Sequence, residues 1–385
     1  MKFACSPDVN LAKQILHELA ERPIVLAPRK VDKPLILYGA GNLGKMASSY
    51  FEKVGIPFLH VLDSNPERYK DDSFWKNVQI IGARDFSAGR KNDFLLAVCV
   101  ATSAFSTVSA ELAKQGWTDV VPFYDIAEAY RDAHPLGNGW FSGKLESNDV
   151  DNIGQVLSRW SDDISRAHHL QFIAWHSLRE DWLFDDAPVN AQEKYFISQV
   201  CSALQDHEVF LDIGAHHGEV CIQFMQATEF KQIWAIEPDP DNFRKLGLEL
   251  QKPAKDGKIR MLSCAIGEKE GRASFFQGLG YASQLGEQGK NVVEVTPIDQ
   301  LGIEPTFIKL HLEGWELGAL KGGLKTIRQC RPIIATTTYH NRLGLWELPK
   351  WLMEHLTGYV FFLRLHSWCG TGAVMYAIPK EKMRF

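Results

Sequence analysis

The sequence has few of the features that mark secreted, membrane-spanning or disulfide-linked proteins. Its seven cysteines are scattered and include no C-x-x-C pair, so we expect reduced thiols inside a cell and no zinc knuckle. No apolar run approaches the roughly 20 residues that cross a bilayer, and residues 1–23 lack the apolar core of a signal peptide. We therefore expect a cytoplasmic protein with no membrane insertion.

An excess of positive charge is also missing. The formal net charge is −5. Lys and Arg number 17 against 18 Asp and Glu up to residue 150, and 25 against 29 after it, so the two parts carry −1 and −4. Neither part offers the basic surface that nucleic acid requires, so nucleic acid is not an expected partner. The 385 residues suffice for two domains with separate cores.

A strand, a tight turn and a helix are predicted around Asp212. The apolar run at 209–211 is short enough for a buried parallel strand, and Gly214 and Gly218 break it before an amphipathic stretch begins. The glycines let the backbone approach a ligand closely, and the following helix offers free N–H groups in its first turn. A second apolar run ends at Glu237, whose carboxylate can accept both hydroxyls of a ribose. This pattern is typical of nucleoside-binding folds.

A second glycine-rich turn lies near the start of the sequence. An apolar strand at 34–38 runs into G-x-G-x-x-G, and the next strand ends in an acidic residue about 20 positions later. The pattern predicts a nucleotide or nucleotide-sugar site formed by Gly39, Gly41, Gly44 and Asp63. The alternative stays open that these glycines serve turn geometry alone. Nicotinamide chemistry is less favoured, because no second catalytic domain follows in the manner of dehydrogenases.

The order of predicted elements becomes regular from residue 208. Seven strands alternate with helices, except that the last two, 359–365 and 374–378, lie close enough to pair antiparallel. A hairpin with a glycine-rich connection is inserted at 273–296. Six parallel strands with one antiparallel partner form the sheet of Rossmann-like methyltransferases. The predicted fold class is therefore α/β, with two Rossmann-like domains, the C-terminal one built on this seven-stranded sheet.

Five motifs in the C-terminal half together resemble those of the FkbM-type methyltransferases. They are Leu211-Asp212-Ile213-Gly214-Ala215 with Gly218, Ile236-Glu237-Pro238-Asp239-Pro240, Cys264-Ala265-Ile266-Gly267, Phe307-Ile308-Lys309 with Glu313-Gly314-Trp315-Glu316, and Arg331-Pro332. The resemblance covers residues 195–380. It implies an S-adenosylmethionine-dependent enzyme, since the family mostly methylates hydroxyls of sugars and of polyketide natural products. We accordingly divide the chain into an N-terminal Rossmann-like domain at 1–130, a helical linker at 131–200 and an FkbM-type domain at 201–385.

The resemblance also implies which residues bind the cofactor. Asp212 and the turn after it would hold the methionine part, Glu237 would bind the ribose hydroxyls, and the segment at 263–265 would border the adenine. A structural alternative for Asp212 is helix capping. The implied cofactor residues are Asp212, Gly214, Ala215, His216, Gly218, Glu237, Cys264 and Ala265.

Lys309, His311 and Glu313 form the predicted catalytic row. Side chains alternate along a strand, so these three would share one face at its carboxyl end, where open α/β sheets bind ligands. His311 stands where the family usually has Asp. We predict His311 as the general base, because its ordinary pKa of about 6.5 lies near neutral pH, with Lys309 or Glu313 orienting it.

Two alternatives stay open for this row. Together with Glu316 and His340 it could hold a divalent metal ion, but Lys309 counts against this, so no metal site is predicted. His311 could instead only form hydrogen bonds within the fold.

The loop at 278–289 and the aromatic residues complete the functional interpretation. The loop has the composition of a mobile lid, although a simple hairpin connection would have the same glycines. Trp315 and Tyr339 follow strand ends and suit a sugar ring. We predict an O-methyltransferase acting on a hydroxyl of a small-molecule or saccharide acceptor, for example in polysaccharide biosynthesis. The competing hypotheses are a nicotinamide-dependent oxidoreductase using the N-terminal domain, and a non-catalytic protein that binds sugar nucleotides.

Overall fold

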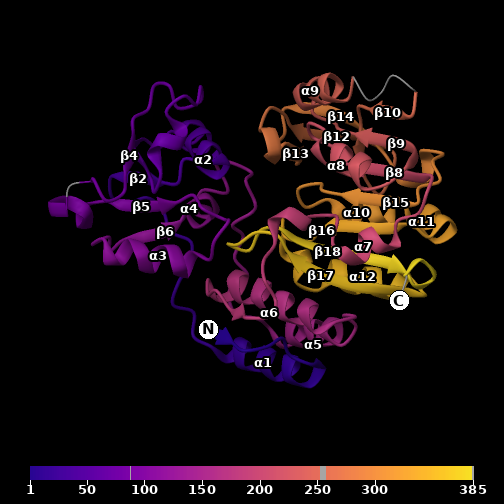
Figure 1. The fold of residues 1–385 in the computed structure, drawn as a ribbon, viewed down its shortest axis with the longest axis horizontal. Coiled ribbons are helices and arrows are strands. Elements are labelled where there is room, and N and C mark those ends of the chain that lie inside the picture. The colour runs from indigo at the N-terminus through magenta and orange to yellow at the C-terminus, as the bar shows by residue number, and fades with distance from the viewer. Residues whose placement is uncertain (87, 252–256, 384–385) are drawn as a thin grey trace.

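The computed structural model describes residues 1–86, 88–251 and 257–383. Figure 1 shows two lobes with a layer of helices beneath them. We call residues 35–129 the front lobe and residues 208–379 the main lobe. Each lobe contains a mainly parallel sheet, so the fold is of the α/β class. No helix among the described residues is long and apolar enough to cross a membrane.

The front lobe is built on five parallel strands in the order β4-β3-β2-β5-β6. The strands are β2 (Leu35–Tyr38), β3 (Phe58–Asp63), β4 (Ile80–Gly82), β5 (Leu95–Val98) and β6 (Val120–Pro122). The helices are α2 (Asn42–Lys53), α3 (Phe105–Lys114) and α4 (Phe123–Ala129). The strand predicted at 34–38 and the next strand, which ends at Asp63, are present as β2 and β3. The sequence does not indicate β4, because three half-buried residues are too few for a periodic pattern.

The main lobe is built on seven strands in the order β10-β9-β8-β15-β16-β18-β17. They are β8 (Glu208–Ile213), β9 (Phe230–Ile236), β10 (Ile259–Leu262), β15 (Phe307–Leu310), β16 (Ile333–Thr337), β17 (Tyr359–Leu365) and β18 (Ala373–Pro379). Neighbours from β10 to β16 pair parallel, and β18 pairs antiparallel with both β16 and β17. The prediction of a seven-stranded, mainly parallel sheet is confirmed.

The inserted hairpin is part of a separate four-stranded sheet with the order β11-β14-β12-β13. Its strands are β11 (Ala265–Ile266), β12 (Gly271–Phe276), β13 (Gln284–Leu285) and β14 (Asn291–Thr296). The long strands β12 and β14 pair antiparallel, as the sequence predicts. The hairpin connection, residues 277–290 between β12 and β14, contains β13.

Five helices accompany the main sheet. They are α8 (Glu219–Ala227), α9 (Pro240–Leu250), α10 (Glu316–Lys321), α11 (Leu324–Cys330) and α12 (Glu347–His355). Between β15 and β16 the chain forms two helices, α10 and α11, which are separated at Gly322 and Gly323. A Cβ on Gly322 would lie 2.2 Å from the carbonyl oxygen of Gly267, so this break lets two backbone segments pass closely.

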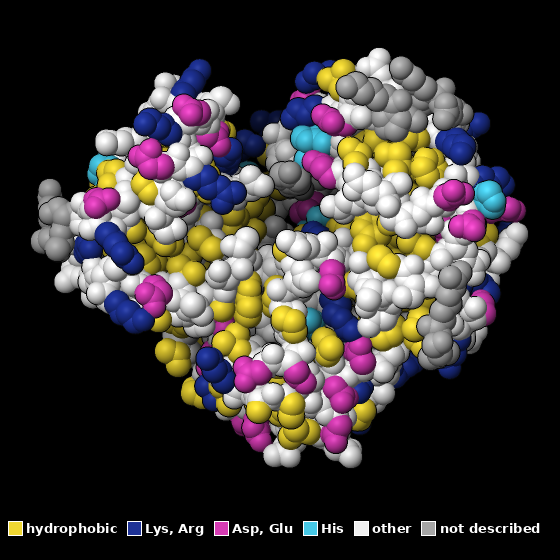
Figure 2. All heavy atoms as spheres, in the orientation of Figure 1, with side chains coloured by type: hydrophobic (Ala, Val, Ile, Leu, Met, Phe, Trp, Pro, Cys, Tyr) yellow, Lys and Arg dark blue, Asp and Glu magenta, His cyan; other side chains and the backbone are white. Residues whose placement is uncertain are grey.

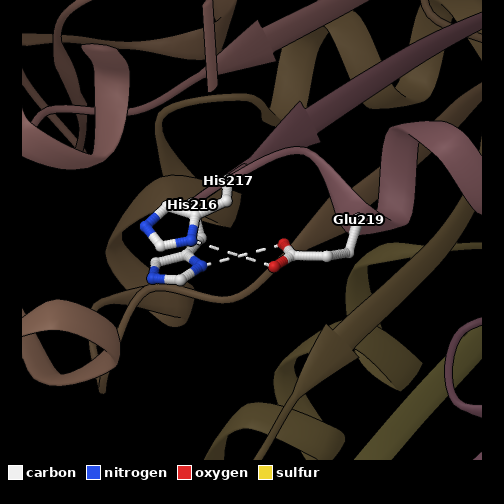
Figure 3. Close-up of side chains that lie close together, drawn as sticks. All are labelled: His216, His217 and Glu219. Atoms are coloured by element: carbon white, nitrogen blue, oxygen red, sulfur yellow. Dashed lines mark ion pairs between the residues drawn. The ribbon is translucent and has the colours of Figure 1, made fainter. Parts of the chain in front are cut away.

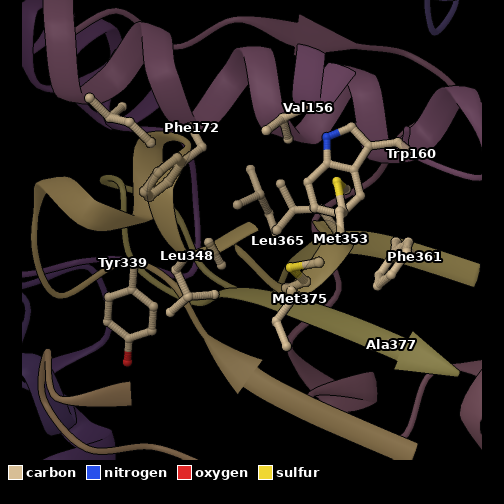
Figure 4. Packing of buried hydrophobic residues seen from close by; sticks show 14 of the residues in the cluster. Val156, Trp160, Phe172, Tyr339, Leu348, Met353, Phe361, Leu365, Met375 and Ala377 are labelled. Atoms are coloured by element: carbon tan, nitrogen blue, oxygen red, sulfur yellow. The ribbon is translucent and has the colours of Figure 1, made fainter. Parts of the chain in front are cut away.

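Three helices form a layer against β17: α1 (Val9–Glu21), α5 (Ser147–Leu157) and α6 (Asp163–Leu178). Figure 4 shows Val156, Trp160 and Phe172 of this layer near Phe361, Leu365 and Met375 of the sheet, and all six belong to one hydrophobic cluster. Much of the segment at 131–200 thus packs into the core of the main lobe. The remaining short elements are β1 (Lys2–Phe3), β7 (Leu183–Phe184) and α7 (Ser198–Ala203).

A buried ion pair fastens the front lobe to the helical layer. The guanidinium of Arg179, at the end of α6, lies 2.7 Å from the carboxylate of Asp125 in α4, and both side chains are almost fully buried. Arg179 also donates to the carbonyl oxygens of Gly139, Trp140 and Trp175. These carbonyl groups are neutral, so Asp125 alone balances the charge of Arg179 in this pair. Loss of Asp125 would leave the buried guanidinium without a counter-charge.

We expect Asp125→Ala to destabilise the protein by about 3–5 kcal/mol, the usual effect of breaking a buried ion pair. Thermal and denaturant unfolding of the full chain would measure the loss. The matched control is Glu294→Ala, which removes the exposed pair with Arg272 and should change stability by less than about 1 kcal/mol. Equal losses in the two variants would contradict the role assigned to Arg179.

Candidate active site

A cavity lies at the carboxyl ends of β8, β9 and β15, the edge at which open α/β sheets bind ligands. Its lining includes part of the predicted cofactor set, namely Gly214, His216, Glu237 and Ala265. The other members of that set lie outside the cavity lining and support the same segments. These are Asp212, Ala215, Gly218 and Cys264.

The turn after β8 depends on its glycines. Gly214 has φ +76°, and a Cβ there would lie 2.0 Å from the carbonyl oxygen of His311. The N–H groups of Gly214 and Ala215 both donate to the carbonyl oxygen of Ile236, which joins the turn to the neighbouring strand. Gly218 has φ +92° and begins α8. The turn therefore requires residues without a side chain at these two positions.

Asp212 supports the turn from beneath. Its carboxylate is fully buried, with one oxygen 2.8 Å from Lys309 Nζ and the other accepting from the Cys221 thiol. Lys309 Nζ also donates to the carbonyl oxygen of Gly214, at 2.7 Å. Since α8 begins at Gly218, Asp212 does not cap this helix. Lys309 thus points to the turn and away from the rest of the predicted catalytic row.

Glu237 faces the same turn from the end of β9. One carboxylate oxygen accepts the His216 N–H at 2.9 Å and the other accepts the Asp239 N–H at 2.9 Å. Burial raises the pKa of Glu237, and these two hydrogen bonds oppose the rise. Each oxygen keeps a further lone pair, so the carboxylate can still accept hydroxyl groups from a ligand.

The strand alternation predicted for 308–313 is wrong beyond Leu310, where β15 ends. His311 and Glu313 follow in a turn, with Glu313 at φ +52°. The turn places the Glu313 carboxylate 3.1 Å from Nε2 of His311 and 3.2 Å from Nδ1 of His340, which follows β16. We call His311, Glu313 and His340 the His–Glu–His cluster. His311 and Glu313 line the cavity.

The protonation states of the cluster follow from its burial and charges. Burial lowers the pKa of His311 to about 3, although Glu313 opposes the change. Burial would raise the pKa of Glu313, but the imidazoles of His340 and His311 hold it well below its usual range. Burial would lower the pKa of His340, but the carboxylates of Glu313 and Glu316 raise it. A neutral His311 with so low a pKa is a weak acceptor for the proton of an alcohol.

The structure brings further residues to the cluster that sequence reasoning did not assign to it. The Tyr195 hydroxyl lies 2.8 Å from Nδ1 of His311, and the Tyr339 hydroxyl lies 3.2 Å from Nε2. Lys194 Nζ lies 5.2 Å and 5.8 Å from the ring centroids of Tyr195 and Tyr339, and burial with the charge of Lys309 lowers its pKa to about 8. Lys194 and Tyr195 precede the whole sheet in sequence, so no local pattern could place them here.

The hairpin connection covers the cavity. One carboxylate oxygen of Asp239 accepts from the N–H of Gly278 and the hydroxyl of Ser283. Trp315, 44% exposed at the rim, donates from its indole N–H to the carbonyl oxygen of Leu285 at 3.1 Å. The cavity beneath measures about 70 Å³, whereas pockets for ligands of drug size hold about 300–1,000 Å³. The connection must therefore move to admit a ligand of that size.

A larger cavity of about 890 Å³ lies at the front lobe, and Figure 2 shows the surface hollowed between the two lobes. Gly39, Gly41 and Asp63 of the predicted second site line this cavity. Gly44 serves packing instead, since a Cβ there would lie 1.9 Å from the carbonyl oxygen of Gly39. His366 and other residues outside the front lobe complete the wall.

A second group of histidines lies beside the glycine turn, as Figure 3 shows. The rings of His216 and His217 are stacked with centroids 3.5 Å apart. The Glu219 carboxylate lies 3.7 Å from Nδ1 of His216 and 3.9 Å from Nδ1 of His217. Glu219 is 56% exposed, so solvent screens this group.

A solved structure of similar fold spans nearly the whole chain. The chain resembles in structure the methyltransferase FkbM from Methylobacillus flagellatus KT, with a TM-score of 0.64 and 21% identity over 96% of this chain and 99% of that one. The precorrin-6y C5,15-methyltransferase from Geobacter metallireducens GS-15 aligns over 51% of this chain and 95% of its own, with a TM-score of 0.30 and 16% identity.

No curated protein matches the sequence. Residues 212–361 match the family model of the methyltransferase FkbM domain. This segment contains the glycine turn, Glu237 and the His–Glu–His cluster. The chain therefore carries an FkbM-type methyltransferase domain over residues 212–361.

Proposed function

We propose that the protein is an S-adenosylmethionine-dependent O-methyltransferase whose acceptor is a hydroxyl of a saccharide. The observation that carries the proposal is the position of Glu237, which ends the strand next to β8 and lines the cavity beside the glycine turn. Its oxygens each hold one backbone N–H and can still accept the two hydroxyls of a ribose.

The residues around the cavity fit the parts of this cofactor. Gly214 and His216 would lie along its methionine part, Glu237 would bind the ribose, and Ala265 would border the adenine. When bound, the cofactor supplies the methyl group, which leaves the sulfonium sulfur as a C–O bond forms to the acceptor. The hairpin connection would act as a lid, because the cavity beneath it is too small for such a ligand.

The acceptor would enter beside Trp315 and the His–Glu–His cluster. The exposed indole offers a flat apolar face next to polar groups, which suits a sugar ring. His311 and Glu313 line the cavity at the same point, so a hydroxyl that reaches the cofactor meets these side chains. Holding that hydroxyl in line with the methyl group would supply much of the rate enhancement.

We expect Glu237→Ala to weaken binding of S-adenosylmethionine and S-adenosylhomocysteine at least tenfold, which corresponds to about 1.4 kcal/mol. The reason is the loss of two charge-assisted hydrogen bonds to the ribose. Calorimetric titration should find one site per chain in the wild type. Asp63→Ala, which removes the corresponding carboxylate of the front lobe, is the matched control and should bind both compounds as the wild type does. Unchanged affinity in Glu237→Ala would remove this residue as the ribose ligand.

We expect Trp315→Ala to raise the KM for a saccharide acceptor roughly 2- to 10-fold, since ring contacts contribute about 0.5–1.5 kcal/mol. Trp315→Phe keeps a flat face and should have a smaller effect. Steady-state kinetics with monosaccharides and nucleotide-sugars would measure both variants. Affinity for S-adenosylhomocysteine should stay the same, and a loss confined to that affinity would contradict a role in acceptor binding.

We also propose that the N-terminal part, residues 1–130, is a Rossmann-like domain that binds a nucleotide or nucleotide-sugar, joined through residues 131–200 to the methyltransferase domain at 201–385. Its support is the cavity beside Gly39, Gly41 and Asp63. The Asp63 carboxylate accepts the N–H groups of Ala40 and Asn65, both at 2.8 Å, the same arrangement as at Glu237.

We expect Gly41→Trp to abolish binding of UDP-glucose and GDP-mannose, because the indole would occupy the cavity. The backbone of Gly41 has φ −69°, and a Cβ there would have only the Tyr69 hydroxyl nearby, at 3.6 Å, so the substitution should not strain the turn. Gly247→Trp, on an open helix surface, is the control. Binding of NADH in preference to both nucleotide-sugars would favour the oxidoreductase hypothesis instead.

A further inference from the structure

We propose that His311, Glu313 and His340 bind a divalent transition-metal ion, and that this ion activates the acceptor hydroxyl. The inference rests on the proposed methyl transfer and states how the nucleophile forms. Two imidazoles converge on one carboxylate, with His311 Nε2 3.1 Å and His340 Nδ1 3.2 Å from its two oxygens. These separations match neighbouring ligands of one ion, whose bonds are about 2.0–2.2 Å long.

The sheet places these ligands together. β15 and β16 are adjacent parallel strands, so the residues after them reach the same edge. His311 follows β15 and His340 lies three residues beyond β16. Glu313 reaches between them because its backbone has φ +52°. Since His311 and Glu313 line the cavity, an ion held here would face the acceptor and the methyl donor.

On each imidazole, the nitrogen that faces away from Glu313 lies near an oxygen atom. Nδ1 of His311 lies 2.8 Å from the Tyr195 hydroxyl. Nε2 of His340 is buried, has no hydrogen bond among the described residues and points toward the Glu316 carboxylate at 3.9 Å. Metal-bound histidines ordinarily donate their second N–H to such oxygens, which fixes the ring and the tautomer.

Glu316 is itself held in place for this role. Its carboxylate accepts the N–H groups of Leu312 and Gly314 and the hydroxyl of Thr337. Asn138 also lies beside the cluster, with its Oδ1, a hydrogen-bond acceptor, 3.0 Å from Nδ1 of His340. The proposed site thus has three ligand side chains, with the Glu316 carboxylate and the Tyr195 hydroxyl beside the imidazoles.

Lys309 counts against a metal ion in the sequence, but in the structure its ammonium group binds Asp212 and the carbonyl oxygen of Gly214. Both ion pairs of Glu313 are with imidazoles, so within the described residues no Lys or Arg forms an ion pair with this largely buried carboxylate.

Two imidazoles with one carboxylate favour first-row transition metals such as Mn²⁺, Co²⁺ or Zn²⁺ over Mg²⁺ and Ca²⁺, which prefer oxygen alone. A hydroxyl coordinated to such an ion loses its proton more easily. In the proposed step the acceptor O–H bond breaks and the proton passes to water. The oxygen then forms a bond to the methyl carbon, the S–C bond breaks, and its electron pair stays on sulfur.

The test uses the full chain, stripped of metal with EDTA and titrated with Mn²⁺ while the electron paramagnetic resonance signal of free Mn²⁺ is followed. We expect one Mn²⁺ per chain, with affinity falling at least tenfold in Glu313→Gln and in His340→Gln. His217→Gln alters the exposed group of Figure 3 and should bind Mn²⁺ as the wild type does. Tyr195→Phe, which removes only an outer partner, should weaken binding about 10- to 100-fold.

Titration of the same samples with S-adenosylhomocysteine separates the two proposals. Binding of this compound with no binding of Mn²⁺, or with Mn²⁺ affinity unchanged in Glu313→Gln and His340→Gln, would overturn the metal site and leave the methyltransferase proposal standing. Loss of Mn²⁺ binding in His217→Gln alone would assign the ion to His216, His217 and Glu219 and would equally overturn the proposal.

If Glu313→Gln and His340→Gln unfold, the Tyr195→Phe variant decides, since an unchanged affinity for Mn²⁺ in this variant would count against the His–Glu–His cluster. Failure to bind S-adenosylhomocysteine in well-folded wild-type protein would refute the proposed function itself.

Discussion

The buried ion pair between Lys309 and Asp212 is the interaction on which the active-site edge depends. The two residues occupy paired positions on β15 and β8, so the bridge joins the central strands of the main sheet. A buried pair is stabilising only when its remaining donors and acceptors are satisfied. Here Lys309 also binds the carbonyl oxygen of Gly214, and Asp212 also binds the Cys221 thiol. The pair thereby fixes the turn in the conformation that leaves Glu237 facing the cavity.

The two lobes share one hydrogen-bonding arrangement at their glycine turns. In each, an acidic residue at the end of the second strand accepts one N–H from the turn and one from two residues further along its own chain. Asp63 does this with Ala40 and Asn65, and Glu237 does it with His216 and Asp239. The carboxylate therefore stabilises the turn itself, whatever it binds. This explains why the sequence pattern alone does not distinguish a nucleotide site from a structural turn.

Much of the sheet architecture could be predicted from the sequence, because buried parallel strands are short apolar runs that end at polar or glycine residues. The strands predicted at 34–38, 359–365 and 374–378 agree with β2, β17 and β18 within one residue at each end. The catalytic edge could be predicted only in part. β15 ends at Leu310, so the alternation that sequence reasoning extended from Lys309 to Glu313 stops there, and no periodic pattern marks the left-handed backbone of Glu313.

Contacts between segments far apart in the chain also could not be predicted from the sequence. Tyr195 reaches His311 across 116 positions of the chain, and Asn138 reaches His340 across 202. Such pairs follow from the packing of the helical layer, which local patterns do not encode. The orientation of Lys309 toward the turn likewise depends on β8 and β15 being neighbours, which no local pattern encodes.

The hairpin connection forms hydrogen bonds with the N-terminal part of the chain as well as with the main lobe. Gln284 donates to the carbonyl oxygen of Pro135, and Lys53 of α2 donates to that of Gly278. Opening the connection must break these contacts as well as those to Asp239, so the free energy of opening depends in part on the front lobe. A ligand of the front lobe that weakens or strengthens these contacts would change the affinity of the cavity for its own ligand. A ligand in the cavity would then change the affinity of the front lobe by the same factor. The hairpin connection is thus one element through which the front lobe and the cavity of the main lobe are coupled in free energy.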